Sequence, residues 1–125
     1  MKIAVTSTGK TPDSQVDPRF GRAAYFIIID TDSMDFDALE NKNIDAAGGA
    51  GINSAKVVID AQAQAILTGN CGPNAQRTLS AAGVKLYTGL KGSVSEAVQL
   101  FKDEKLTQTN EPNVTSHFGM DNKNA

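Results

Sequence analysis

The sequence has a single cysteine and no tryptophan, and these scarcities exclude several classes of protein. One cysteine cannot form an internal disulfide, so the chain is no disulfide-stabilised secreted scaffold. No apolar run approaches the roughly 20 residues of a membrane span, and the N-terminal run is too short for a signal peptide. The formal net charge of −2 creates no field that attracts nucleic acid or anionic lipid. We therefore expect a cytoplasmic protein that binds neither nucleic acid nor membrane.

Residue combinations typical of catalytic sites are also missing. The chain has no Ser/His/Asp set and no H-E-x-x-H or C-x-x-C motif. Before the polar C-terminal stretch that begins at residue 107, it also has no Cys/His pair. A cysteine nucleophile without a nearby base is poorly activated. The one histidine, His117, lies in a polar C-terminal stretch, where we expect no specific role for it. The sequence therefore predicts a protein without enzymatic activity.

Hydrophobic periodicity predicts one α/β domain over residues 1–106, followed by a flexible polar tail over 107–125. Alternating or continuous apolar runs predict strands at 2–7, 25–30, 36–43, 63–69 and 84–89. Apolar residues at helical spacing predict helices at 52–62, 73–82 and 92–105. Ser93 and Glu96 form the sequence signature of a capping box at the start of the last helix.

The order of these elements predicts the topology of the sheet. The first three strands can form a meander, whereas the later strands alternate with helices and should pair in parallel through right-handed crossovers. The economical result is a five-stranded mixed sheet in the order 3-2-1-4-5. The loops 8–24, 46–53, 69–73 and 89–93 then leave one edge of the sheet, where the three helices begin. Open α/β sheets bind ligands at such a switch point, here between the first and fourth strands.

At this switch point GKTPDSQVDPRFGR (9–22) would face GNCGP (69–73). Helix N-termini carry unsatisfied N–H donors and partial positive charge, which favour anions. Lys10, Arg19 and Arg22 add cationic donors, and Cys71 would lie just before a helix, where the pKa of a thiol falls. An anionic metal–sulfur cluster accepts both kinds of donor. Because one cysteine cannot hold a four-cysteine cluster, the pattern favours loose binding by a carrier.

RFGRAAYFIIID (19–30), the glycine loop before the first helix and GNCGPNA (69–75) together resemble the dinitrogenase iron–molybdenum cofactor biosynthesis family. The resemblance extends over residues 1–105. It implies a ribonuclease H-like fold with three α/β/α layers and the strand order 3-2-1-4-5. It also implies binding of the iron–molybdenum cofactor, its precursors or a related iron–sulfur cluster, with cluster donor and acceptor proteins as partners of a monomer or weak homodimer.

The resemblance also supplies candidate residues. It implies that Arg19 to Arg22 form one binding motif and that Cys71 belongs to a second. Some cofactor-handling members of the family carry a histidine where this chain has Arg19. The complete candidate set for binding is Lys10, Arg19, Phe20, Gly21, Arg22, Gly49, Cys71 and Gly72, with Cys71 as the metal ligand.

Structural roles compete with these functional ones. Cys71 could be a buried small residue at a turn, and Phe20 an anchor that holds its loop on the core. The arginines could pair with Asp13 and Asp17. The glycines of GGAG (48–51) could serve only to permit a tight turn, since no GK[ST] follows to complete a phosphate-binding loop.

Three other functions remain open at this point. A ribonuclease H-type enzyme needs clustered carboxylates for two metal ions, but the first strand carries none, and Asp30 and Asp60 do not converge. A binding module for a nucleotide or another phosphorylated small molecule would use the same helix starts. A protein–protein adaptor would need no ligand. Metal and sulfide content distinguishes the carrier from these alternatives.

Overall fold

The computed structural model describes residues 1–42 and 48–109. Five strands and three helices follow one another in these residues. They are β1 (Lys2–Ser7), β2 (Tyr25–Asp30), β3 (Phe36–Glu40), α1 (Ala50–Asp60), β4 (Ala65–Leu67), α2 (Pro73–Ala81), β5 (Lys85–Tyr87) and α3 (Val94–Lys102). The predicted tail from residue 110 onward, with His117, and the first part of the predicted glycine loop (46–47) lie outside the described residues.

The strands form one mixed sheet in the order β3-β2-β1-β4-β5, which confirms the predicted topology. β1 pairs antiparallel with β2, aligning Ser7 with Tyr25, and β2 pairs antiparallel with β3. On its other side β1 pairs in parallel with β4, aligning Val5 with Leu67, and β4 pairs in parallel with β5. The chain therefore leaves β1 toward β2 on one side of the sheet and leaves β4 toward β5 on the other, as the switch-point argument requires.

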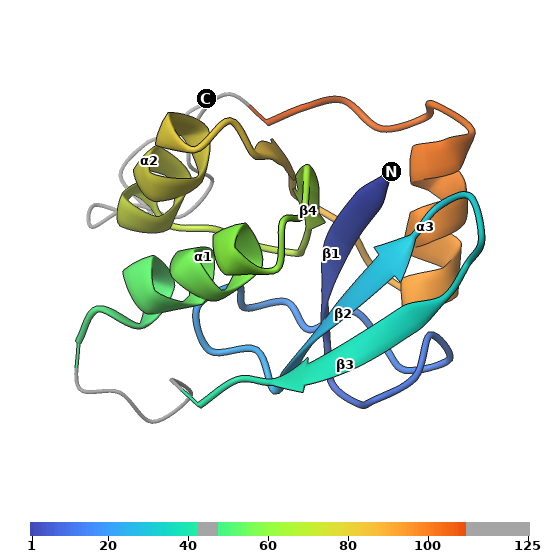
Figure 1. Ribbon diagram of the computed structural model, residues 1–125, viewed down its shortest axis with the longest axis horizontal. Coiled ribbons are helices and arrows are strands. Elements are labelled where there is room, and N and C mark those ends of the chain that lie inside the picture. The colour runs from blue at the N-terminus through green and yellow to red at the C-terminus, as the bar shows by residue number, and fades with distance from the viewer. Residues whose placement is uncertain (43–47, 110–125) are drawn as a thin grey trace.

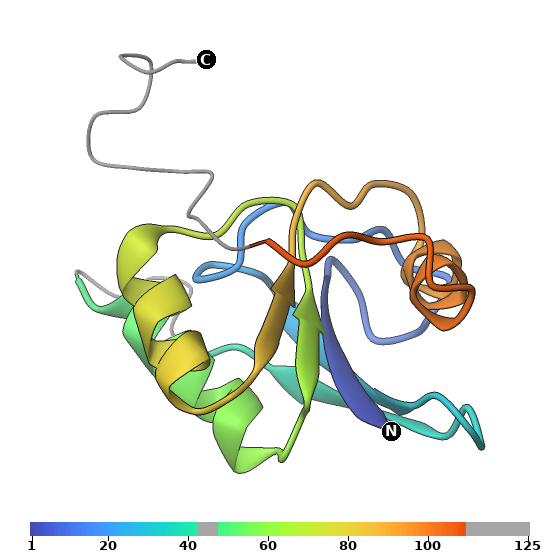
Figure 2. The same ribbon diagram turned by 90° about the horizontal axis from the view of Figure 1, so that it is seen from above.

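Two helix layers enclose the sheet (Figures 1 and 2). Figure 2 shows α1 and α2 together on one face and α3 alone on the other. Alternation along the strands divides the core accordingly: Ala4 and Phe26 face α1 and α2, whereas Val5 and Ile27 face α3. The central strands bury both faces, which is why YFIIID (25–30) contains so few polar residues.

Element ends differ from the prediction where side chains redirect the backbone. β3 ends at Glu40 rather than at residue 43, because Asn41 turns inward and its Nδ2 donates to the carbonyl oxygens of Gly21 and Ala23. α1 begins at Ala50 rather than at residue 52, since Gly49 adopts a left-handed conformation (φ 73°) that lets the helix start earlier. The predicted capping box at Ser93 and Glu96 is confirmed.

The outer edge of β5 is covered by the chain itself. The backbone N–H of Thr109 donates to the carbonyl oxygen of Leu86 at 2.7 Å. The Thr109 hydroxyl accepts from the Thr88 N–H at 3.1 Å and lies 2.8 Å from the Thr88 hydroxyl. Residues 107–109, which the sequence assigns to the tail, thus end in contact with the sheet. Within the described residues, every helix is too short or too polar to cross a bilayer.

Candidate functional site

The long connection between β1 and β2 divides into two arms at the edge of the sheet. Its first arm pairs with the start of α3: the Val16 N–H donates to Gly92 O, and the Val94 N–H donates to Ser14 O. Ser93 and Glu96 also cap that helix start. All three helices begin at the predicted edge, but the chain itself covers the start of α3. Among the described residues, the starts of α1 and α2 are the two that stay open to a ligand there.

The second arm, residues 17–24, is fastened to the turn after β4. The Asn70 N–H donates to Pro18 O at 2.8 Å, and the Phe20 N–H donates to Asn70 O at 3.1 Å. Gly69 fits directly against Pro18, since a Cβ at Gly69 would lie 2.7 Å from the Pro18 Cα. The predicted juxtaposition of the RFG and GNCGP segments is therefore present, as a pair of hydrogen-bonded loops.

Asp17 holds the second arm in shape from inside. Its side chain is only 3% exposed, and one carboxylate oxygen accepts from the Arg19 N–H and from Arg19 Nε, at 3.0 and 3.3 Å. The other oxygen accepts from the Ala24 N–H at 3.2 Å. The Thr6 hydroxyl donates to the backbone oxygen of Asp17 and lies 2.8 Å from the Thr68 hydroxyl. Asp17 thereby sets the loop geometry and orients Arg19.

Small residues let this arm approach both helix starts. Gly21 lies so close to α1 that a Cβ there would sit 3.0 Å from the Gly51 Cα and N. A Cβ at Gly51 would in turn sit 3.2 Å from the Ala75 Cβ of α2. The Ser54 hydroxyl donates to Gly21 O at 2.8 Å and fixes the approach. The loop, α1 and α2 thus meet through backbone rather than through large side chains.

Two adjoining hollows open where these three segments meet. One, of about 210 Å³, reaches from Gly21 to the starts of both helices, at Gly49 and Asn74. The other, of about 460 Å³, lies beside Arg19, Arg22 and Asn70. Both hollows are lined by Phe20, Gly21, Gly51 and Gly72. We call the two hollows together the helix-start site.

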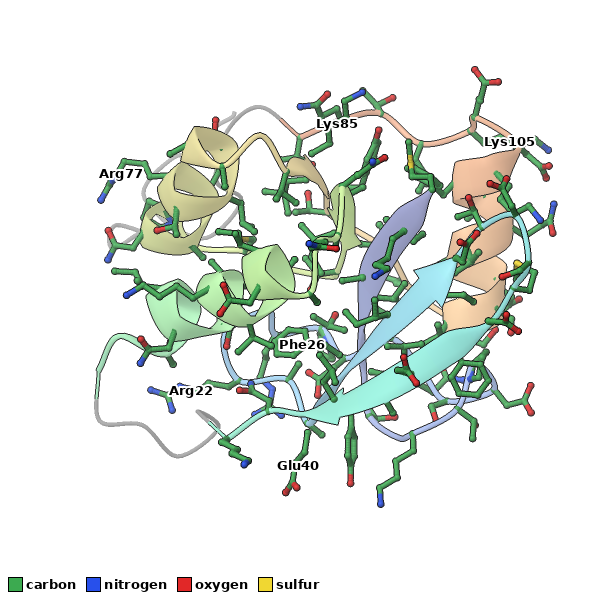
Figure 3. All side chains as sticks on the ribbon, in the orientation of Figure 1. Arg22, Phe26, Glu40, Arg77, Lys85 and Lys105 are labelled. Atoms are coloured by element: carbon green, nitrogen blue, oxygen red, sulfur yellow. The ribbon has the colours of Figure 1, made fainter. Side chains whose placement is uncertain are left out.

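The electrostatic character of the helix-start site favours an anion. Neither Gly49 nor Gly72 provides a side-chain cap, and neither helix has an acidic residue in its first turn. Within the part of the chain that the structure describes, no N-cap side chain therefore caps the first N–H groups of α1 or of α2, whose first residue, Pro73, has no N–H. The two helix dipoles add partial positive charge. The Arg19 side chain is 58% exposed, and Figure 3 shows Arg22 extending outward below the start of α1. Two guanidinium groups thus border a cradle of backbone donors.

Cys71 lies beneath this site and faces the core. It is 1% exposed and packs in the cluster that contains Phe26 and Leu79. Its Sγ is 3.7 Å from Gly72 O, and burial raises the pKa of the thiol to about 12. The predicted lowering of this pKa by the helix start is therefore wrong, because loss of hydration outweighs the favourable dipole. The neighbours Asn70 and Gly72 line the hollows, whereas Cys71 does not.

The remaining candidate residues separate into three roles. Phe20 is 2% exposed and tilts against Phe26 with ring centroids 5.8 Å apart, so it anchors the loop and also forms the floor of both hollows. Gly49 lines the smaller hollow. Lys10 lies 5.8 Å over the Tyr25 ring and lines neither hollow.

Sequence reasoning missed Asn70, Asn74 and Gly51, all of which line the hollows. It noted Asp17 only as a partner for an arginine, not as the residue that shapes the loop. An Asp followed by Pro and Arg in a turn-rich stretch is a signal for such a side-chain turn.

The donor set suits an anion held by hydrogen bonds. In residues 1–42 and 48–109, no three His, Cys, Asp or Glu side chains gather as ligands for a metal ion. The site offers N–H and guanidinium donors, which can bind the sulfide or oxygen atoms of an anionic cluster without direct bonds to its metals. The geometry therefore fits a negatively charged group with its own internal ligands better than a bare cation.

Comparison with known proteins gives matches along nearly the whole chain. The model of the dinitrogenase iron-molybdenum cofactor family matches residues 1–104. The orange protein from Desulfovibrio gigas, solved in its apo form, is similar with a TM-score of 0.88 and 42% identity, over 90% of this chain and 96% of that chain. A NifB-type protein from Thermotoga, of the DUF35 family, has a TM-score of 0.75 and 38% identity, over 86% and 91% of the two chains. An uncharacterised protein of Methanocaldococcus jannaschii is 28% identical over 109 residues, 85% of this chain and 89% of that protein.

Proposed function

Because the chain belongs to the dinitrogenase iron-molybdenum cofactor family, we propose that it is a non-enzymatic carrier of an anionic metal–sulfur cluster. The cargo is an iron–sulfur or molybdenum–iron–sulfur cluster, or a precursor of one. The resemblance of the sequence to this family is confirmed by the match over residues 1–104. The relatives named for NifB and for the apo orange protein add support for a cofactor-related role.

One observation carries the proposal: the starts of α1 and α2, both without side-chain caps, open into the same hollow beside Arg19 and Arg22. The start of α3, by contrast, is capped by the side chains of Ser93 and Glu96. Helices commonly have Ser, Thr, Asp, Asn or Gly as the N-cap residue, and of these Gly leaves the first N–H groups without a side-chain acceptor. Two neighbouring starts that lack such caps are suited to an anion from outside the chain.

The hollows also match the manner of binding that a carrier needs. Together they expose the cargo to solvent along the arginine side, through which a donor or acceptor protein can reach it. Hydrogen bonds and charge hold such a cargo without a covalent bond to the protein, so transfer requires no ligand exchange at a metal. We therefore place the cargo against Gly21, Gly51 and Gly72, three lining residues that have no side chain of their own.

The part that Cys71 plays in this carrier stays a prediction. Coordination of a cluster metal by Sγ requires the thiol to turn from the core and lose its proton, against a pKa raised to about 12. We propose that the backbone donors and the arginines provide the principal binding free energy. On this account, Cys71 supports the floor of the site through packing with Phe26 and Leu79.

Anaerobic reconstitution tests the proposal. The native chain is incubated with iron and sulfide or, separately, with a preformed molybdenum–sulfide anion, and the metal retained after gel filtration is measured together with charge-transfer absorbance. We expect retention of metal and sulfide by the native chain and by Cys71→Ala. Retention lost only in Cys71→Ala would assign the cargo to the thiol instead of the backbone donors.

Parallel titrations distinguish this carrier from a binding module for phosphorylated ligands. Helix starts bind phosphate by the same physical principle as a cluster. Parallel titrations with ADP and with inorganic phosphate, followed by amide chemical shifts, show which anion the helix-start site prefers. Tight binding of ADP with no retention of metal and sulfide would replace the carrier by the phosphate-binding module.

A further inference from the structure

A further hollow lies at the opposite edge of the sheet. It has a volume of about 590 Å³ and is formed between the C-terminal end of α3, the turn after β2 and the start of β5. Pockets for small ligands commonly span about 300 to 1,000 Å³. Met1 and Lys85 both line this hollow, and Figure 3 shows Lys85 at the end of the sheet where Figure 1 marks the N-terminus. We call this hollow the basal groove.

Aromatic and aliphatic side chains form one wall of the basal groove. Tyr87 of β5 and Phe101 of α3 meet edge to face, with ring centroids 5.4 Å apart and planes at 84°. Both rings are half-buried, and Leu106 packs beside them. A half-buried aromatic pair leaves ring surface that a planar apolar group can cover.

The charges around the groove are unevenly distributed. The α-amino group of Met1 is 3.2 Å from Asp32 and 3.8 Å from Asp30, so these carboxylates already have a cationic partner. Lys85 and Lys102 form no ion pair within the described residues. Lys102 Nζ instead contacts Met34 Sδ at 3.7 Å, which holds it near the turn after β2. With Glu104 the groove and its rim have three carboxylates and three cationic groups, and Lys85 and Lys102 are the two cations on the side away from the Met1 pair.

We propose that the basal groove is a second binding site, for a small organic anion with a planar apolar body. The planar body lies against Tyr87 and Phe101, and the anionic group lies between Lys85 and Lys102. The carboxylates of Glu104 and Asp32 repel the anionic group of the ligand from their side of the groove. This site is independent of the helix-start site, which lies beyond the other ends of the same strands.

The test compares three probes with one ring system and different charge. Indole-3-propionate is the anion, tryptophan the zwitterion and tryptamine the cation, each titrated into the labelled full chain while amide chemical shifts are recorded. We expect indole-3-propionate to shift residues 31–32, 85–87 and 101–106 and to bind at least about tenfold more tightly than tryptamine. Equal binding of the three probes, or shifts confined to residues 19–22 and 49–52, would overturn the assignment.

Matched variants separate charge from packing. Lys85→Gln/Lys102→Gln is expected to weaken the binding of indole-3-propionate at least about tenfold. The control Lys56→Gln/Lys91→Gln changes the net charge by the same amount away from the groove, and its affinity is expected to stay within about twofold of the native chain. Phe101→Leu keeps an apolar residue in the core and is expected to weaken all three probes. Arg19→Gln/Arg22→Gln leaves the affinity unchanged. Equal weakening by both lysine pairs would reduce the effect to net charge and contradict the site.

Discussion

The backbone N–H of Asn70 donates to the carbonyl oxygen of Pro18 at 2.8 Å, and Asn70 Nδ2 reaches the same oxygen at 3.1 Å. Fifty-two positions separate these residues in the chain, yet this contact fixes the mouth of the helix-start site. It joins the arm that carries Arg19 and Phe20 to the turn that carries Cys71. The predictions below follow from this junction and from the groups that support it.

Substitution of Gly69 by alanine should force the two loops apart. Its Cβ would lie 2.7 Å from Pro18 Cα and 3.0 Å from Pro18 O, and a backbone neighbour cannot simply rotate away. Overpacking of this kind destabilises by about 1 to 3 kcal/mol. Urea unfolding measures the loss, and Gly48→Ala serves as the control because nothing lies within 4 Å of a Cβ there. Equal stability of the two variants would show that the junction is looser than described.

Asp17→Asn should weaken both the fold and the retention of cargo. Each carboxylate oxygen accepts a backbone N–H, and the amide nitrogen of asparagine cannot replace one of these acceptors. A buried donor left without a partner costs about 1 to 3 kcal/mol. Chemical denaturation and metal retention are measured for Asp17→Asn and for Asp13→Asn, an exposed residue of the same loop. If Asp17→Asn had the stability and the metal retention of the native chain, Asp17 would not be a positioning residue.

The Cys71 thiol should make stability depend on pH in the alkaline range. Burial raises its pKa to about 12, so the folded chain keeps the proton while the unfolded chain loses it from about pH 9 upward. The stabilisation is fully present below that pH and falls as the pH rises toward 12, by about 1.4 kcal/mol per pH unit.

Cys71→Ala provides the reference, since alanine does not titrate. The difference in unfolding free energy between native chain and variant is measured by urea denaturation at pH 8, 9 and 10. We expect this difference to shift against the native chain above pH 9, and the native thiol to react slowly with alkylating reagents at pH 8. A difference independent of pH, or rapid alkylation, would mean that the thiol is accessible to solvent and to a metal.

Thr109→Val should loosen the segment that covers β5. Valine keeps the shape of threonine but removes the hydroxyl that accepts from the Thr88 N–H. A lost hydrogen bond of this type costs about 1 kcal/mol. Amide exchange of β5 and thermal unfolding are compared with Thr107→Val, which changes an exposed hydroxyl two positions earlier. No change in the protection of β5 would place the end of the ordered domain before Thr109.

The sheet was predictable because its signals are local and periodic. Apolar alternation identified the strands, and Ser93 and Glu96 marked the start of α3 within one residue. The meander followed by two crossovers leaves one economical strand order, which the structure has.

The interior of the site was less accessible to sequence reasoning because its contacts are not periodic. Nothing in the residues near Cys71 shows which way Sγ points, and its direction decides whether burial or the helix dipole controls the pKa. The division of loop 8–24 into two arms likewise depends on hydrogen bonds from Val16 to Gly92 and from Asn70 to Pro18. Such pairings join distant segments through backbone atoms, which every residue type provides.

The most direct test of the central claim is the dissociation constant of a molybdenum–sulfide anion, measured by anaerobic equilibrium dialysis for Arg19→Gln/Arg22→Gln and for the charge-matched control Lys56→Gln/Lys91→Gln. Two lost charge-assisted hydrogen bonds should weaken binding at least about tenfold, and the control should stay within about twofold of the native chain. The weakening should shrink as ionic strength rises, since salt screens exposed charges. Native affinity in Arg19→Gln/Arg22→Gln, or equal losses in both double variants, would contradict a carrier that holds its cargo at the helix-start site.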